Sequence, residues 1–154
     1  MAVAILSLQR RVRIPVERLR RVAGVALRAL GRGGRDVHLT FVSDARIRAL
    51  NARYRGVRAA TDVLAFPLET PGPSRLLGEV IISADTAWRQ ARGLRVPLVI
   101  ELELLVVHGL LHLVGYDDRD PREARLMHTR ARGILQAARR RSPGRLWTGL
   151  LTTA

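Results

Sequence analysis

The sequence predicts an α/β or mixed α+β fold, with a small mixed β-sheet of about four strands surrounded by helices. Short runs rich in valine and isoleucine are interspersed with longer segments whose apolar residues recur every three or four positions. The two kinds of segment mix without strict alternation, which favours a small mixed sheet. The length of 154 residues suits one domain with one core. We expect that domain to span residues 1–140 and residues 141–154 to form a basic tail.

The predicted strands are runs of β-branched and other apolar residues, some of which alternate with polar residues. In chain order they are residues 2–14, 36–42, 63–66 and 77–83. The first run is expected to form one long strand or a pair of strands that Pro15 closes. Pro67 ends the third run, because proline has no backbone N–H to donate to a sheet.

The predicted helices show apolar residues at spacings of three and four, or follow a residue that can cap a helix. They are residues 16–30, residues 45–54 after Ser43, a segment from Ser83 or Asp85 to about Gly93, a segment from Pro97 to near Gly115, and residues 121 to about 140. In the last helix we expect Leu126, Met127, Ile134 and Leu135 to face the core. At and after the end of this helix, we expect Arg139, Arg140, Arg141 and Arg145 to form a solvated end that can add phosphate contacts.

Composition and charge narrow the possible functions. The chain has 27 basic residues, all arginine, against 13 acidic ones, for a net charge of +14. A protein with this net positive charge attracts polyanions, and guanidinium groups bind phosphate well. Nucleic acid is therefore a candidate partner. The alternative is a charged surface with no specific partner. The absence of cysteine excludes disulfides, a cysteine nucleophile and thiolate metal sites. We see no targeting or membrane-spanning segment and predict a cytoplasmic protein without a membrane partner.

The segment from His108 to Asp118 carries the clearest chemical signal. His108 and His112 lie four positions apart in the most apolar predicted helix, so their imidazoles can face one ion. Gly115 lets the chain turn back and bring Asp117 or Asp118 over the same face. Two histidines and a carboxylate with an open position form a known catalytic zinc arrangement. The alternative is a pair of core histidines, but buried imidazoles need polar partners that are scarce here.

The same segment lacks the residue that a zinc peptidase needs. Gly109 stands beside the first histidine, where the metalloprotease helix H-E-x-x-H has its general-base glutamate. This helix could therefore hold an ion without supporting peptide hydrolysis.

Several motifs resemble those of the YbeY family, the bacterial rRNA maturation factors and endoribonucleases. The string HGLLHLVGYDD at 108–118 is similar to the family signature H-G-x-L-H-L-x-G-Y-D-H. Three further segments resemble N-x-x-Y-R-G, T-D-V-L-S-F-P and L-G-D-I-x-I-S, in the same order, at residues 51–56, 61–67 and 77–83. The resemblance covers residues 1–138 and implies the YbeY architecture, with the metal-binding helix at its centre.

The resemblance also implies roles for single residues. It implies one zinc ion held by three histidines, but Asp118 stands at the third position, so the expected ligands are His108, His112 and Asp118. A carboxylate is a harder ligand, so another divalent metal, including non-haem iron, remains open. The functional arginine of the family falls on Arg55, which we expect to be catalytic together with His108 and His112. Arg55 and Tyr116 are the predicted substrate-binding residues, although Tyr116 could instead pack against the site.

The expected function is a metal-dependent endoribonuclease specific for single-stranded RNA. The resemblance implies that it acts in rRNA processing, at the 3′ end of 16S rRNA, and in ribosome quality control. Its partners would be ribosomal RNA and the small ribosomal subunit. One alternative is an RNA-binding factor of ribosome assembly whose metal is structural and whose catalysis is slight. Another is a metallohydrolase acting on a small molecule or peptide, which the charge and Gly109 disfavour.

Overall fold

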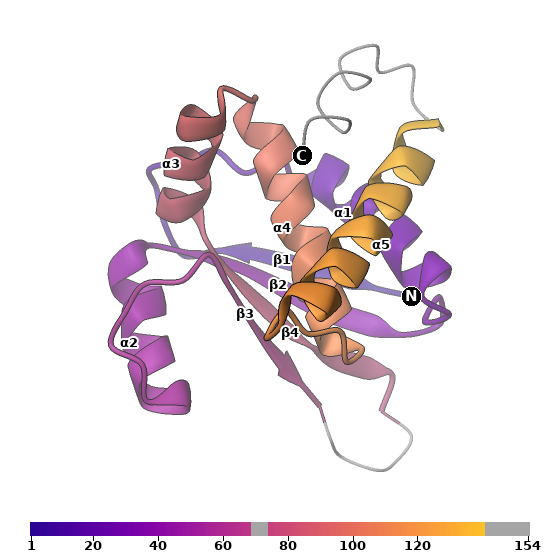
Figure 1. The fold of residues 1–154 in the computed structure, drawn as a ribbon, viewed down its shortest axis with the longest axis horizontal. Helices are drawn as coiled ribbons and strands as arrows, with labels where there is room; N and C mark the ends of the chain where they lie inside the picture. The colour runs from indigo at the N-terminus through magenta and orange to yellow at the C-terminus, as the bar shows by residue number, and fades with distance from the viewer. Residues whose placement is uncertain (69–73, 141–154) are drawn as a thin grey trace.

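A computed structural model describes residues 1–68 and 74–140, and it confirms the predicted α/β class. The strands are β1 (Val3–Ser7), β2 (Asp36–Val42), β3 (Val63–Pro67) and β4 (Leu76–Ser83). They form one mixed sheet in the order β1-β2-β4-β3 (Figure 1). β1 and β4 both pair with β2 in parallel, and β3 pairs with β4 antiparallel at one edge. The predicted tail, residues 141–154, lies outside the described residues.

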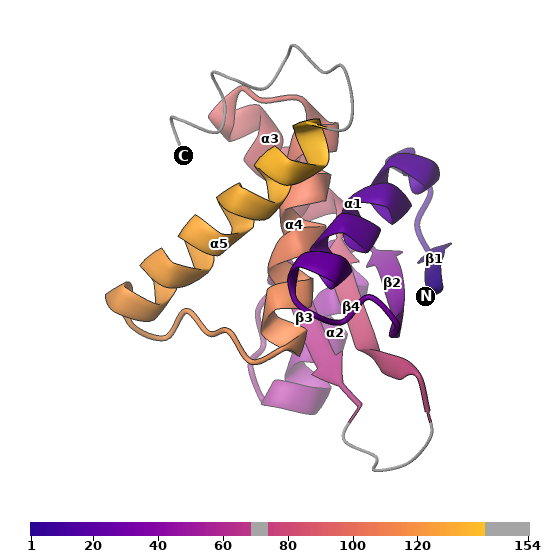
Figure 2. The ribbon, with the colours of Figure 1, turned by 90° about the vertical axis from the view of Figure 1, so that its right-hand side faces the viewer.

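Five helices accompany the sheet in the described part of the chain. They are α1 (Val16–Ala29), α2 (Asp44–Arg55), α3 (Ala84–Leu94), α4 (Leu98–Leu113) and α5 (Pro121–Arg140). Helices α1, α4 and α5 contribute to the main hydrophobic core, whereas α2 packs on the other face of the sheet. Figure 2 shows α4 between α5 and α1, so α4 is the central helix of the fold. None of these helices is long and apolar enough to cross a membrane.

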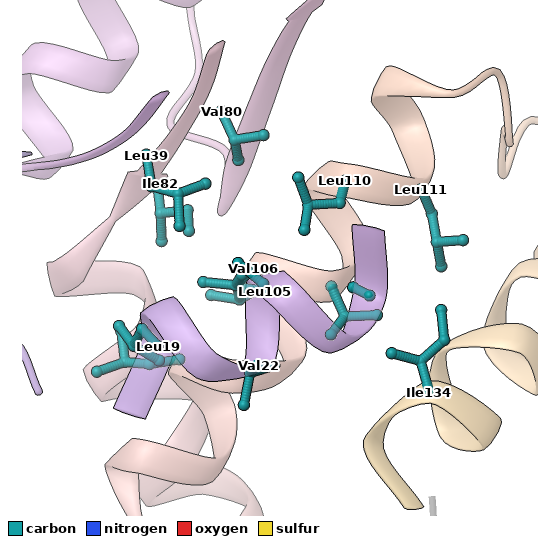
Figure 3. Packing of buried hydrophobic residues seen from close by; sticks show 14 of the residues in the cluster. Leu19, Val22, Leu39, Val80, Ile82, Leu105, Val106, Leu110, Leu111 and Ile134 are labelled. Atoms are coloured by element: carbon teal, nitrogen blue, oxygen red, sulfur yellow. The ribbon is translucent and has the colours of Figure 1, made fainter. Parts of the chain in front are cut away.

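The main core lies between the sheet and the helices α1, α4 and α5. Figure 3 shows part of this core, in which Leu105 and Val106 of α4 belong to the same cluster as Leu39 and Ile82 of the strands and Leu19 of α1. A smaller cluster on the opposite face joins α2 to the sheet and consists of Val42, Ile47, Leu64 and Ile81. α4 therefore reaches the sheet with one side while α1 and α5 cover others, and this arrangement fixes its position in the fold.

The strand predicted over residues 2–14 is wrong beyond Ser7. The Gln9 side chain bonds both polar groups of the Val12 backbone: its amide nitrogen donates to the Val12 carbonyl at 2.8 Å, and its oxygen accepts from the Val12 N–H at 2.8 Å. The same amide nitrogen donates to Ser7 Oγ at 2.9 Å. These bonds satisfy the backbone locally, so residues after Ser7 turn instead of extending the sheet.

Two expectations about α5 are also wrong. Leu126 is 61% exposed, because the buried stripe of this helix runs through Met127, Ile134 and Leu135, and Leu126 is turned about 100° from Met127. Arg139 is not a solvated residue but is only 8% exposed. Its guanidinium donates to both carboxylate oxygens of Glu103 on α4, at 2.7 and 2.9 Å. Arg139 therefore joins α5 to the central helix.

Candidate metal centre and active-site cleft

Helix α4 holds the two histidines of the predicted metal site in fixed positions. His108 and His112 are both half-buried, and their ring centroids lie 5.4 Å apart with an angle of 30° between the ring planes. Burial, together with the neighbouring His112, lowers the pKa of His108. The neutral form of His108 is therefore favoured, and a neutral imidazole has the lone pair that a metal ion needs.

The third candidate ligand comes from the turn that follows α4. Gly115 has a φ of 102°, in the region that side-chain-bearing residues rarely adopt, and this reverses the chain direction. One ligand atom from each of His108, His112 and Asp118 then lies within 4.8 Å of the other two. Asp117 stands outside this group. Its carboxylate accepts from the Asp118 N–H at 2.7 Å, so it caps the turn.

The donor set fits a divalent metal such as zinc. The Nδ1 atom of His112 lies 3.1 Å from the carbonyl oxygen of Tyr116. A carbonyl can only accept, so Nδ1 carries the proton and Nε2 remains a lone-pair donor. A hydrogen bond of this kind orients many metal-binding histidines. With His108 neutral and the Asp118 carboxylate exposed, two nitrogens and one oxygen are available, which is a common zinc donor set.

Gly109 has a packing role that explains why no glutamate can stand beside His108. A Cβ atom built on Gly109 would lie 2.3 Å from Cγ1 of Val80 and 3.1 Å from Cγ2 of Val63. The position thus faces the sheet at close range and not the metal-binding face. A larger side chain would push α4 away from β3 and β4 and displace both histidines.

The three candidate ligands line a cleft of about 660 Å³ at the β3 edge of the sheet. Its walls come from the end of α2, from β3 with the residues before it, and from the turn after α4. The lining residues include Arg55, Thr61, Asp62, Phe66, Tyr116 and Arg119. The structure thus places every predicted site residue, including Arg55 and Tyr116, at one cleft. Tyr116 is half-buried and packs partly against the main core.

Arg55 reaches the cleft because α2 ends there. Ser43 caps the start of this helix, its Oγ accepting from the Arg46 N–H at 3.3 Å. Gly56 ends it with a φ of 71°. The buried Asn51 side chain then donates to the Ala59 carbonyl at 2.9 Å and holds the loop that leads to β3. Arg55 itself is exposed, so its guanidinium is free to approach a ligand in the cleft.

Asp62 and Glu101 are two further carboxylates in this part of the molecule. Asp62 lines the cleft at the start of β3, and Gln90 of α3 donates to it at 3.4 Å. Glu101 lies in α4 two turns before His108 and is buried. Burial and the negative charge of Asp62 raise the pKa of Glu101 to about 7.

Sequence analysis missed two residues of the cleft, Tyr54 and Arg119. Tyr54 is part of the N-x-x-Y-R-G motif, directly before Arg55, and that adjacency was the available signal. Arg119 follows Asp118 directly and pairs with the Asp117 carboxylate at 2.6 Å. In a chain with 27 arginines, no local pattern distinguishes it.

By its fold and its cleft, the protein is an α/β protein with a candidate metal centre between its central helix and one edge of a mixed sheet. Comparison with known proteins narrows this class. The family model described as Endoribonuclease YbeY matches residues 6–139. The chain belongs to this family of endoribonucleases, which are hydrolases acting on the phosphodiester bonds of RNA.

Individual relatives agree with this assignment. The Endoribonuclease YbeY of Anaeromyxobacter sp. (strain Fw109-5) is 48% identical over 147 residues, which covers 91% of this chain and 77% of the relative. That of Moorella thermoacetica is 46% identical over 128 residues, covering 76% and 82%. The solution structure of TM1509 from Thermotoga maritima has a similar fold, with a TM-score of 0.60, 25% identity and 88% of each chain covered.

Proposed function

We propose that this protein is a metal-dependent endoribonuclease that cleaves single-stranded RNA, with His108, His112 and Asp118 as metal ligands. Its role would be the processing of ribosomal RNA in the cytoplasm, at the 3′ end of 16S rRNA, and ribosome quality control. Residues 1–140 would form the catalytic unit. The observation that carries this proposal is the grouping of three ligand atoms within 4.8 Å in a cleft that Arg55 also lines.

The metal proposed for this site is zinc, one ion per chain. When bound, zinc supplies Lewis acidity, which polarises a phosphoryl oxygen or lowers the pKa of a water molecule. His108, His112 and Asp118 would supply three ligands, and zinc sites that perform catalysis have three protein ligands and one open position. Because Asp118 adds a negative charge and a hard oxygen donor, the site also suits harder divalent metals.

Arg55 is the residue proposed to stabilise charge during cleavage. Phosphodiester cleavage builds negative charge on the non-bridging oxygens, and a guanidinium held near them lowers the barrier. The anchored end of α2 limits how far Arg55 can move, and its exposure lets it reach the substrate. The net charge of +14 adds long-range attraction for the RNA backbone, so binding should weaken steeply with salt.

The test compares cleavage of single-stranded rRNA by matched preparations of wild type and variants, together with metal content by mass spectrometry. His108→Ala and His112→Ala should lose both the metal and the activity. Arg55→Ala should lose activity at unchanged metal content. The controls are His38→Ala on β2 and Arg48→Ala on α2, which remove exposed side chains of the same types away from the cleft.

Two results would overturn the proposal. If carefully prepared wild-type protein contains no bound metal, the proposed metal site is refuted. Equal residual cleavage by wild type and His112→Ala would identify a contaminating nuclease. The second result would favour an RNA-binding assembly factor that has little catalysis of its own.

A further inference from the structure

Tyr54 presents an aromatic ring to solvent at the rim of the cleft. It occupies the last turn of α2, directly before Arg55, and it is 58% exposed. Aromatic residues make up only 4% of the chain, and they are more often found in cores or at binding sites than exposed in isolation. An exposed tyrosine beside the proposed catalytic arginine therefore suggests a ligand that covers its ring.

Two contacts fix the ring in its orientation. The ring of Phe66 on β3 makes a T-shaped contact with it, with centroids 5.4 Å apart and an angle of 69° between the ring planes. Phe66 is half-buried and packs against the smaller core cluster, so it is a rigid support. The guanidinium of Arg53 lies over one face of the Tyr54 ring, 5.5 Å from its centroid. The ring thus has a T-shaped contact with Phe66 of the sheet and a positive charge over one face, while the residue as a whole stays 58% exposed.

A nucleobase is the ligand that matches these features. Every base has a flat π-face, and bases of single-stranded RNA stack on exposed aromatic rings while nearby cations hold the phosphates. The adjacent Arg55 is placed for a phosphate contact in the same cleft. Tyr116, the other tyrosine of the cleft, offers less ring surface because it packs partly against the main core.

We propose that Tyr54 is a stacking platform for one base next to the phosphate that Arg55 contacts. This inference rests on the proposed function and deepens it, because it identifies a source of preference for single strands. A base inside a duplex is already stacked on both faces and paired. Only an unpaired nucleotide can turn its face toward Tyr54 without the cost of opening a helix.

The test measures binding and not cleavage, so it does not depend on the metal. A chelator blocks turnover, and fluorescence anisotropy gives the Kd of a short single-stranded rRNA oligonucleotide. A set of otherwise identical oligonucleotides carries one abasic nucleotide at successive positions. The proteins are wild type, Tyr54→Ala, Tyr54→Phe and the control Trp88→Ala, which removes a 37% exposed aromatic residue on α3, outside the cleft.

Tyr54→Ala should weaken binding of the intact oligonucleotide by about tenfold or more, as loss of one stacked base does. Tyr54→Phe and Trp88→Ala should bind like wild type. One abasic position should weaken wild-type binding by a similar factor and have no further effect on Tyr54→Ala. The thermal unfolding midpoint of Tyr54→Ala shows whether the variant is folded.

The proposal is overturned if folded Tyr54→Ala binds like wild type, or if every abasic position weakens both proteins by equal factors. Failure of the proposed function would be seen separately, as wild type that cleaves no RNA with metal present. The binding measurement tests stacking independently of that outcome, because it is made under conditions without turnover.

Discussion

Replacing Glu101 with glutamine measures the cost of a buried carboxylate in the helix that carries the histidines. Glu101 is 4% exposed, and burial together with the charge of Asp62 raises its pKa from the usual 4.5 to about 7. A folded-state pKa above the unfolded value means that the folded protein binds this proton more tightly. The stability that Glu101 contributes is therefore fully present below pH 4.5 and is lost as the pH rises through 7.

The size of the effect follows from the shift. A rise of about 2.5 pKa units, at about 1.36 kcal/mol per unit, sets an upper limit of about 3.4 kcal/mol. Glutamine has a similar shape and no charge to lose, so Glu101→Gln should remove this pH dependence. We expect the free energy of unfolding of wild type, relative to the variant, to fall by about 2–3 kcal/mol between pH 5 and pH 8.

Urea unfolding followed by circular dichroism at pH 5, 6, 7 and 8, with chelator present, gives these free energies. Both proteins contain the same histidines, so histidine titration cancels in the difference. Glu123→Gln, at an exposed position near the start of α5, removes the same charge and controls for net charge. A wild-type-minus-variant difference that stays constant with pH, within about 0.5 kcal/mol, would refute the reasoning.

Two further substitutions test how α4 is held in place, both by urea unfolding. Arg139→Ala removes two hydrogen bonds from the buried Glu103 but leaves it the bond from Arg18 at 2.9 Å, so it should destabilise by about 1.5–3 kcal/mol. Arg125→Ala on the exposed face of α5 should change little. Gly109→Ala puts a Cβ about 2.3 Å from Val80 and should destabilise by about 1–3 kcal/mol. The double variant Gly109→Ala/Val80→Ala should be less destabilised than the sum of the two single variants, because Val80→Ala removes the atoms that the new Cβ meets. If the two destabilisations simply add, the clash is contradicted.

The grouping of the three candidate ligands was predictable because its signal is local. The spacing of His108 and His112 already places both rings on one face of a helix, and the nearby glycine permits the turn that returns Asp118. The choice between Asp117 and Asp118 was not readable from spacing alone. It depends on which carboxylate caps the turn, and in the structure that is Asp117.

The features that sequence analysis got wrong or missed depend on contacts between distant segments or on one side chain. Arg139 belongs to a run of arginines that looks solvent-exposed, yet it meets Glu103, which lies 36 positions earlier in the chain. The predicted strand does not continue after Ser7, because the Gln9 side chain makes the backbone hydrogen bonds that Val12 would otherwise make in a sheet. Tyr54 gains its support from Phe66, on the next strand. Neither periodicity nor propensity contains these pairings.

The positions of the three candidate ligands indicate which of them could be replaced without loss of the fold. His108 and His112 belong to a helix whose neighbour Gly109 touches the sheet, so their backbone positions are set by the core. Asp118 instead is exposed and follows α4 outside the regular elements, so the core does not depend on its side chain. Asp118 can therefore be replaced by another metal-binding residue without repacking of the hydrophobic core. What the exchange alters is the charge and hardness of the donor set, and hence the metal that the site prefers.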